Sequence, residues 1–140
     1  MYTIRKQWHV EMAHRLTEAH TKACSDCIHG HTYTIELFLE AEDLDSTGMV
    51  IDFGALGEIK ALVMRFDHAL MLESRPENQH EMISNKNIMW VDFNPTAENM
   101  ARELYERIAM SSPIKGQQRI RLAKVRVHET ASGFAEFQKS

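Results

Sequence analysis

The alternation of apolar and polar positions predicts two pairs of strands. Residues 2–13 combine aromatic and β-branched side chains with charged ones, which suits a first strand. From His31 to Glu42 apolar and polar side chains alternate, as in an antiparallel strand that is buried on one face. Alternation returns from Arg119 to Thr130 and, after a turn at Ser132-Gly133, a closing strand runs from Phe134 to Phe137.

Helical spacing predicts two helices between these strand pairs. The first begins near Asp52 as its N-cap, with apolar residues at helical spacing: Phe53, Leu56, Ile59 and Val63. The polar segment 73–87 reads as a loop, and a brief strand signal covers Ile88 to Phe93. The second helix begins with Thr96 as N-cap and Glu98 in its first turn, and its buried face carries Met100, Leu104 and Ile108.

The order strand, strand, helix, helix, strand, strand predicts one α+β domain spanning residues 1–140. We expect the strands to share one antiparallel sheet and both helices to cover one of its faces. This arrangement leaves the other face and both sheet edges uncovered. Closure into a barrel with further copies would cover them, so we expect a homo-oligomer.

Composition narrows the possible partners. The net charge of −4 and the lack of a basic run argue against a nucleic-acid partner. No apolar stretch has the length of a transmembrane helix and no apolar leader is visible, so we expect no membrane partner and a cytoplasmic location. Cys24 and Cys27 are then expected to be reduced thiols.

Three histidines form the strongest candidate site. His29 and His31 are two residues apart at the start of a predicted strand, so they project to the same side. Antiparallel pairing of the first two strands would bring His14 to them. Three imidazoles with one open position are typical of a catalytic zinc. The alternative interpretation is a set of surface or hydrogen-bonded histidines at the end of a hairpin.

Other polar residues suggest acid–base chemistry but leave their roles open. Cys24 and Cys27 have the spacing of a zinc knuckle, yet no second cysteine pair completes a four-thiolate site. A thiol beside a metal-bound substrate could instead be a general base, or both could be small buried residues. Asp67-His68 could be an acid–base pair or a charge pair at a helix end. Glu129 is a carboxylate near the end of a strand.

Six fragments in order resemble the 6-pyruvoyltetrahydropterin synthase and 6-carboxytetrahydropterin synthase family over nearly the whole chain. They are Ala13-His14-Arg15-Leu16, His29-Gly30-His31-Thr32-Tyr33, Asp45 to Phe53, Phe66 to Leu70, Asn94 to Asn99, and Val125 to Thr130. The resemblance implies the tunnelling fold, in which trimers close a barrel and two trimers stack as a hexamer. It also implies a zinc cofactor and a dihydropterin substrate.

The resemblance implies roles for individual residues as well. The zinc ligands would be three histidines, His14, His29 and His31. A cysteine would be the base that moves protons on the substrate side chain, with Asp67 and His68 as its partners. Glu129 would anchor the pterin ring, and Thr96 and Glu98 would lie near that pocket.

The position of the cysteine departs from the family pattern. Bacterial members usually place three residues between the cysteine and the first histidine of the His-Gly-His motif, and the mammalian type places five. Here Cys24 leaves four and Cys27 leaves one. We favour Cys24, because Cys27 is too close to His29 to reach the substrate freely. A variant branch that cleaves dihydroneopterin has a glutamate in place of the cysteine, and no glutamate lies between Cys24 and His29.

The resemblance therefore predicts a zinc-dependent lyase. It would convert 7,8-dihydroneopterin triphosphate to 6-carboxy-5,6,7,8-tetrahydropterin and release acetaldehyde and triphosphate, and the product would feed queuosine and other deazapurines. Three alternatives remain open. They are a 6-pyruvoyltetrahydropterin synthase, which eliminates triphosphate without cleaving the side chain, a non-catalytic member that binds zinc or pterin, and a redox or zinc-sensing module built on Cys24 and Cys27.

Overall fold

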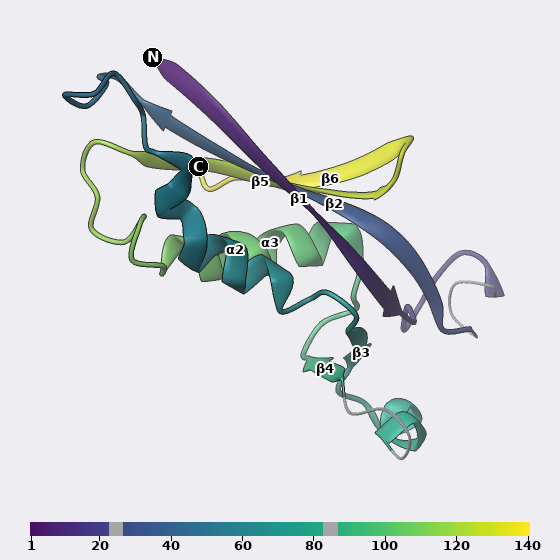
Figure 1. Cartoon of the computed structure of the whole chain (residues 1–140). Helices are drawn as coiled ribbons and strands as arrows, with labels where there is room; N and C mark the ends of the chain where they lie inside the picture. The colour runs from purple at the N-terminus through teal and green to yellow at the C-terminus, as the bar shows by residue number, and fades with distance from the viewer. Residues whose placement is uncertain (23–26, 83–86) are drawn as a thin grey trace.

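The computed structural model describes residues 1–22, 27–82 and 87–140, without the side chains of residues 80–82, and Figure 1 shows its course. Its elements in chain order are β1 (Tyr2–His14), β2 (His29–Ala41), the 3-10 helix η1 (Phe53–Leu56), α2 (Gly57–Met64), β3 (Leu70–Glu73), the 3-10 helix η2 (Pro76–Met82), β4 (Ile88–Val91), α3 (Ala97–Ala109), β5 (Arg121–Thr130) and β6 (Gly133–Phe137). The predicted α+β class is confirmed.

The strands form one sheet in the order β4-β3-β1-β2-β5-β6. The long strands β1 and β2 pair antiparallel along their whole length, and β5 and β6 continue the antiparallel pattern. On the other side, β3 is parallel to β1 and β4 is parallel to β3. The sheet is therefore mixed, and our expectation of a wholly antiparallel sheet was wrong. The short run Leu70–Leu72 is buried throughout, so it lacks the alternation by which the other strands were recognised.

Both helices cover the same face of this sheet, and Figure 1 shows α2 and α3 together on one side of the long β1–β2 hairpin. In β1 the buried positions are the even ones, from Trp8 to His14. From Tyr33 to Ala41 in β2 they are the odd ones, and Glu36 on the other face is buried as well. The apolar side chains among them form the core with α2 and α3. The opposite face carries alternating polar residues of the same strands and is called the helix-free face below.

The predicted helix starts are confirmed, with one change in form. The Asp52 carboxylate accepts a hydrogen bond from the backbone N–H of Gly54, but it caps η1, and α2 begins only at Gly57. Phe53, which the helical spacing assigned to the apolar face, is 49% exposed, and the Lys6 ammonium lies over its ring. Thr96 caps α3 as predicted, because its Oγ1 accepts from the Asn99 N–H at 3.2 Å.

A bulge explains why the alternation in β5 changes phase. Leu122 and Ala123 are neighbours in sequence and both are buried. In the β2–β5 ladder Phe38 pairs with Lys124 and Leu39 pairs with Leu122, so Ala123 is left without a partner. The extra residue shifts the inward positions from even to odd numbers.

The packing of α3 gives a direct stability prediction. Leu104 is fully buried between α3 and the sheet. Leu104→Ala is expected to lower the free energy of unfolding by about 3 kcal/mol, through lost apolar burial and the cavity left behind. Denaturant unfolding followed by circular dichroism measures the change. The control is Arg102→Ala on the exposed side of the same helix, and equal losses for the two variants would contradict the packing described here.

Candidate active site

The structure brings the three motif histidines together at the end of the β1–β2 hairpin. His14 pairs with His29 in the final rung of the ladder, and His31 pairs with Met12. One nitrogen from each ring lies within 4.8 Å of the other two. The ring centroids are 4.6 Å apart for His14 and His29, 5.3 Å for His14 and His31, and 5.0 Å for His29 and His31. All three rings project to the helix-covered face.

Backbone carbonyls fix the orientation of two of these rings. His14 donates its Nδ1–H to the Pro95 carbonyl at 2.8 Å, and His29 donates its Nδ1–H to the Cys27 carbonyl at 3.1 Å. Because a carbonyl can only accept, each neutral ring keeps an unprotonated Nε2. These two Nε2 atoms lie 3.0 Å apart. Two nitrogen lone pairs at that distance repel, and a cation bound to both would remove the repulsion.

The third nitrogen points to the same conclusion. The Nε2 of His31 is buried and has no hydrogen-bond partner among the described residues. Burial also lowers the pKa of His14, which keeps its imidazole neutral and available as a ligand. Three convergent ring nitrogens, of which the His31 Nε2 has no hydrogen-bond partner among the described residues, fit a divalent metal ion. Imidazole is a common ligand of zinc and other transition metals.

Tyr33 extends this cluster in a way that the sequence analysis missed. Its side chain is fully buried, and its hydroxyl oxygen lies 3.2 Å from the Nδ1 of His14. Burial raises the pKa of the Tyr33 phenol, so it stays a neutral hydroxyl. The signal was present in the sequence, because Tyr33 follows His31 by two residues and so shares its face of β2.

Glu129 lies next to the histidines at the mouth of a groove. Its Oε1 is 3.5 Å from the Nε2 of His31. The groove has a volume of about 310 Å³, and its lining includes Thr96, Glu98 and Phe134. Three of the residues that we expected around a substrate thus share one groove beside the histidine cluster. The Thr96 oxygen is already engaged as the cap of α3, although its O–H remains a donor.

Asp67 and His68 form a hydrogen-bonded dyad at the open edge of β1. His68 Nδ1 lies 2.8 Å from Asp67 Oδ2, and the other oxygen, Oδ1, accepts the Glu11 N–H at 2.8 Å. The His68 N–H donates to the Glu11 carbonyl at 2.5 Å. His68 has a φ of 60°, in the left-handed region that β-carbon-bearing residues seldom adopt. The contacts with Glu11 therefore hold a strained backbone that presents the imidazole.

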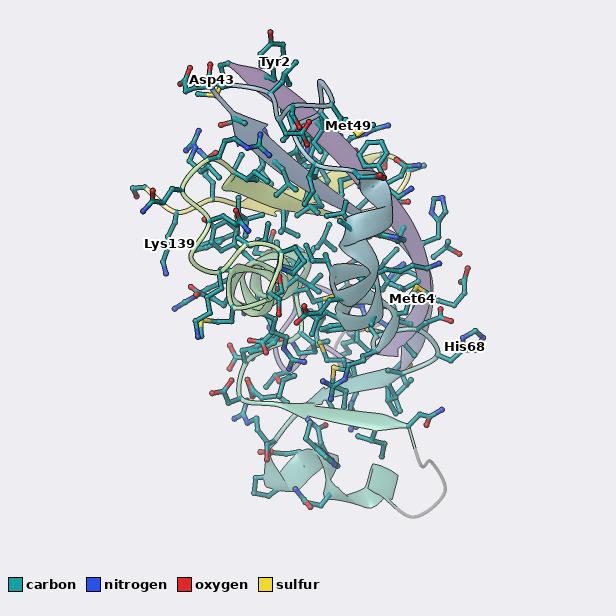
Figure 2. The ribbon with its side chains drawn as sticks, turned by 60° about the vertical axis from the view of Figure 1, so that its left-hand side comes forward. Tyr2, Asp43, Met49, Met64, His68 and Lys139 are labelled. Atoms are coloured by element: carbon teal, nitrogen blue, oxygen red, sulfur yellow. The ribbon has the colours of Figure 1, made fainter. Side chains whose placement is uncertain are left out.

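The dyad and the histidine cluster lie on opposite faces of the sheet. His68 lines a pocket of about 400 Å³ together with Glu11 and Thr32 of the helix-free face, and His31 contributes to the same lining. The Thr32 hydroxyl donates to the Glu11 carboxylate there. Figure 2 shows the labelled His68 side chain pointing away from the body of the molecule, and 75% of that side chain is exposed. Among the described residues, no hydrogen bond or ion pair joins Asp67 or His68 to the three histidines.

The dyad makes a prediction about pH. The Glu11 N–H and His68 lower the pKa of Asp67 below its ordinary value of 3.8. This stabilisation is present above the unfolded-state pKa and is lost as the pH falls through the folded-state pKa. Asp67→Asn should therefore melt below the native protein at pH 7, and the difference should shrink below pH 3.8. Melting temperatures of both proteins, measured from pH 7 to 3, test this, and Asp92→Asn at an exposed position is the control. A difference in melting temperature that stays the same at every pH would contradict the prediction.

The two cysteines are only partly covered by the structure. Cys24 lies outside the described residues. The Cys27 side chain is exposed, and its carbonyl is the group that orients His29. Cys27 thus has a backbone role at the histidine cluster, and which thiol serves as base stays a prediction.

The fold and the site together define a class of protein: an α+β domain with a cluster of three histidines that could hold a metal ion, beside a groove lined by carboxylates. The sequence profile described as 6-pyruvoyl tetrahydropterin synthase matches residues 3–140. The chain belongs to the 6-pyruvoyl tetrahydropterin synthase family. Among the described residues, no helix has the length and apolar character needed to cross a membrane.

Named relatives and solved structures agree with this family. A 6-carboxy-5,6,7,8-tetrahydropterin synthase of Helicobacter pylori is 33% identical over 142 residues, which cover 95% of this chain and 70% of the relative. The 6-carboxy-5,6,7,8-tetrahydropterin synthase of Rickettsia conorii is 32% identical, and the match covers 90% of this chain and 92% of the relative. A crystal structure of a protein from Wolinella succinogenes shares the fold with a TM-score of 0.78 at 19% identity. The match covers 99% of this chain and 98% of that chain. The structure of the Caenorhabditis elegans 6-pyruvoyl tetrahydropterin synthase has a TM-score of 0.69 and 22% identity, and the match covers 99% of this chain and 96% of that chain.

Proposed function

We propose that this protein is a zinc-dependent lyase that converts 7,8-dihydroneopterin triphosphate and water to 6-carboxy-5,6,7,8-tetrahydropterin, acetaldehyde and triphosphate. The observation that carries the proposal is the set of three convergent imidazole nitrogens beside the Glu129 groove. The names of the relatives at about one-third identity support the choice of substrate. The product would enter the synthesis of queuosine and other deazapurines.

Glu129 would recognise the pterin ring. A pterin presents a guanidine-like edge with adjacent N–H donors, and a carboxylate can accept two of them at once. The Glu129 carboxylate stands at the groove that Thr96 and Glu98 also line. A ring held there would place its side chain towards the neighbouring His31.

His14, His29 and His31 would hold the zinc ion. Bound zinc supplies a Lewis acid that stabilises negative charge on the hydroxyl and keto oxygens of the substrate side chain. The carbonyls of Pro95 and Cys27 keep the ligand nitrogens of His14 and His29 unprotonated. The protein must then remove and return protons at the side-chain carbons, which requires a base near the same cavity.

We assign the base to Cys24 and its proton-transfer partners to the Asp67–His68 dyad. Within the chain no hydrogen bond or ion pair joins the dyad to the three histidines, and 75% of the His68 side chain is exposed, so we expect the dyad to complete the cavity of another copy. The proposal therefore includes a homo-oligomer, a trimer or a dimer of trimers, in which one chain supplies the metal and Glu129 and its neighbour supplies the dyad. The uncovered edges β4 and β6 are where further copies would pair.

This division of labour predicts that two inactive variants restore each other. His14→Ala lacks a metal ligand and His68→Ala lacks the dyad imidazole, so each is expected to be inactive alone. Refolded together at equal amounts, they should regain about a quarter of native activity, since a shared site needs two intact contributions. Mixing His14→Ala with His29→Ala, which both damage the metal site, is the matched control. No recovery in the first mixture would contradict a site shared between copies.

The function itself is tested by product analysis. The purified protein, with its zinc content measured, is incubated with 7,8-dihydroneopterin triphosphate, and the products are separated by liquid chromatography and identified by mass spectrometry. The proposal expects 6-carboxytetrahydropterin and acetaldehyde in equal amounts. A 6-pyruvoyl product without acetaldehyde would assign the triphosphate-eliminating activity instead. An unchanged substrate with zinc bound would contradict the enzyme assignment and favour a binding protein.

A further inference from the structure

Glu129 sits in a break of the β5 pairing. In the β2–β5 ladder the last pair is Thr34 with His128. In the β5–β6 ladder His128 pairs with Phe134, and the next pair is Thr130 with Gly133. Glu129 therefore has no partner in either ladder, whereas His128 has one in both. An unpaired residue of this kind bends the strand and changes the direction of its side chain.

His128 is held on the helix-free face by contacts with both neighbouring strands. Its Nε2 makes a short contact with the Oε1 of Glu36 in β2. Its ring also lies against the Phe134 ring in β6, with a centroid distance of 5.1 Å. The side chain of the last regular residue before the break is thus held by both neighbouring strands.

Glu36 is the centre of this attachment. Its side chain is only 3% exposed although it lies on the helix-free face. It accepts a hydrogen bond from Arg5 Nη1 in β1 at 2.8 Å, and Arg126 Nη1 in β5 lies 3.7 Å from it. Burial alone would raise the pKa of Glu36, but the hydrogen bond and charge of His128, the hydrogen bond from Arg5 and the charge of Arg126 lower it below its ordinary value. An ionised, buried carboxylate held by these partners resists displacement.

We infer that Glu36 and His128 are a positioning pair for substrate recognition: their contact fixes the backbone at the β5 break and so directs Glu129 towards the groove beside His31. The pair touches neither metal nor substrate. Glu129 directly follows His128, so holding the His128 side chain between β2 and β6 also fixes the backbone from which Glu129 projects. The inference rests on the proposed function, in which Glu129 anchors the pterin ring.

The same face offers a matched control. Glu136 in β6 accepts a hydrogen bond from Arg126 Nε at 2.8 Å and lies 3.3 Å from the Lys124 ammonium. Glu136 pairs with Arg126 in a regular part of the ladder. Removing its charge therefore disturbs the polar network of the helix-free face without releasing His128.

A double-mutant cycle separates positioning from a general structural effect. The single variants are His128→Phe, which keeps a ring but cannot donate to Glu36, and Glu129→Gln. We expect His128→Phe to raise KM for 7,8-dihydroneopterin triphosphate about tenfold while kcat changes less than about threefold, because a displaced anchor weakens binding more than chemistry. In the Glu129→Gln background the same change should add almost nothing to KM. His128→Gln, which can donate to Glu36, should restore KM, and Glu136→Gln should match the native protein.

The contrary results distinguish the positioning role, the anchor role of Glu129 and the proposed function. Equal effects of His128→Phe with and without Glu129, or a similar effect of Glu136→Gln, would overturn the positioning role while the lyase assignment stands. An unchanged KM in Glu129→Gln would remove the anchor and the positioning pair together. If native protein shows no turnover, the proposed function fails, and the cycle is measured as Kd for the same compound by titration calorimetry. If His128→Phe does not fold, Glu36→Leu, which removes the acceptor for His128, takes its place in the cycle.

Discussion

Replacing His14 with alanine is expected to remove bound zinc and enzymatic turnover together. His14 is fully buried, and its Nε2 lies 3.0 Å from that of His29, so the site loses its central ligand. Two imidazoles hold zinc far less well than three, because every lost ligand must be replaced by water. Loss of Lewis-acid activation, worth several kcal/mol, should lower kcat by at least about a thousandfold.

Zinc content by elemental analysis and the rate of acetaldehyde release measure this effect in the same preparation. His9→Ala is the matched control, since His9 belongs to the same strand but faces the helix-free side, where it contacts the Thr34 hydroxyl. It is expected to keep full zinc and full turnover. A His14→Ala protein that retains stoichiometric zinc would place the metal elsewhere and contradict the site described above.

The second large effect concerns the thiols. Cys24→Ala is expected to lower kcat by about a hundredfold to ten-thousandfold while the zinc content stays unchanged, because a general base contributes to proton transfer and not to metal binding. Cys27→Ala should reduce kcat only slightly. The Cys27 side chain is exposed, and its contribution to His29 comes from the backbone carbonyl, which alanine retains.

The same pair of variants tests the sensing alternative. If the two thiols were metal ligands, alkylation of the native protein would release zinc. In the enzyme account alkylation stops turnover and zinc stays bound, because the three ligands are histidines. An activity loss confined to Cys27→Ala would transfer the role of base to that thiol.

Periodicity in the sequence was sufficient to predict the elements that bury one face. The aromatic and β-branched composition of residues 2–13 and the alternation from His31 to Glu42 predicted two paired strands, and the ladder from Tyr2 with Ala41 to His14 with His29 has that form. The side chains of Asp52 and Thr96 cap the first turn of η1 and of α3. These features depend on local physical preferences, so a single sequence contains the information.

Contacts distant in sequence were beyond that kind of prediction. The strand β3 is buried on both sides and pairs parallel with β1, and neither fact leaves a periodic trace in Leu70–Leu72. The dyad shows the same limit. Asp67-His68 could be read as an acid–base pair, but its place on the helix-free face depends on the contacts with Glu11, fifty-six residues away in sequence for the Asp67 bond.

The candidate site, too, was predicted only in part from the sequence. The spacing of His29 and His31 predicted a shared side, and antiparallel pairing predicted that His14 would join them, as the structure has it. The sequence did not indicate that the carbonyls of Pro95 and Cys27 would set the tautomers of two rings. Backbone groups carry no residue-type signal, so their contribution becomes visible only in the folded chain.

A zinc titration of the metal-free protein tests the central claim most directly. The protein is stripped with a chelator, and acetaldehyde release from 7,8-dihydroneopterin triphosphate is followed as zinc is added. The account predicts no release without metal, a linear rise, and a sharp plateau at one zinc ion per chain, with neither rise nor plateau in His14→Ala. Full release from the metal-free protein, or a rise that is the same in His14→Ala, would contradict it.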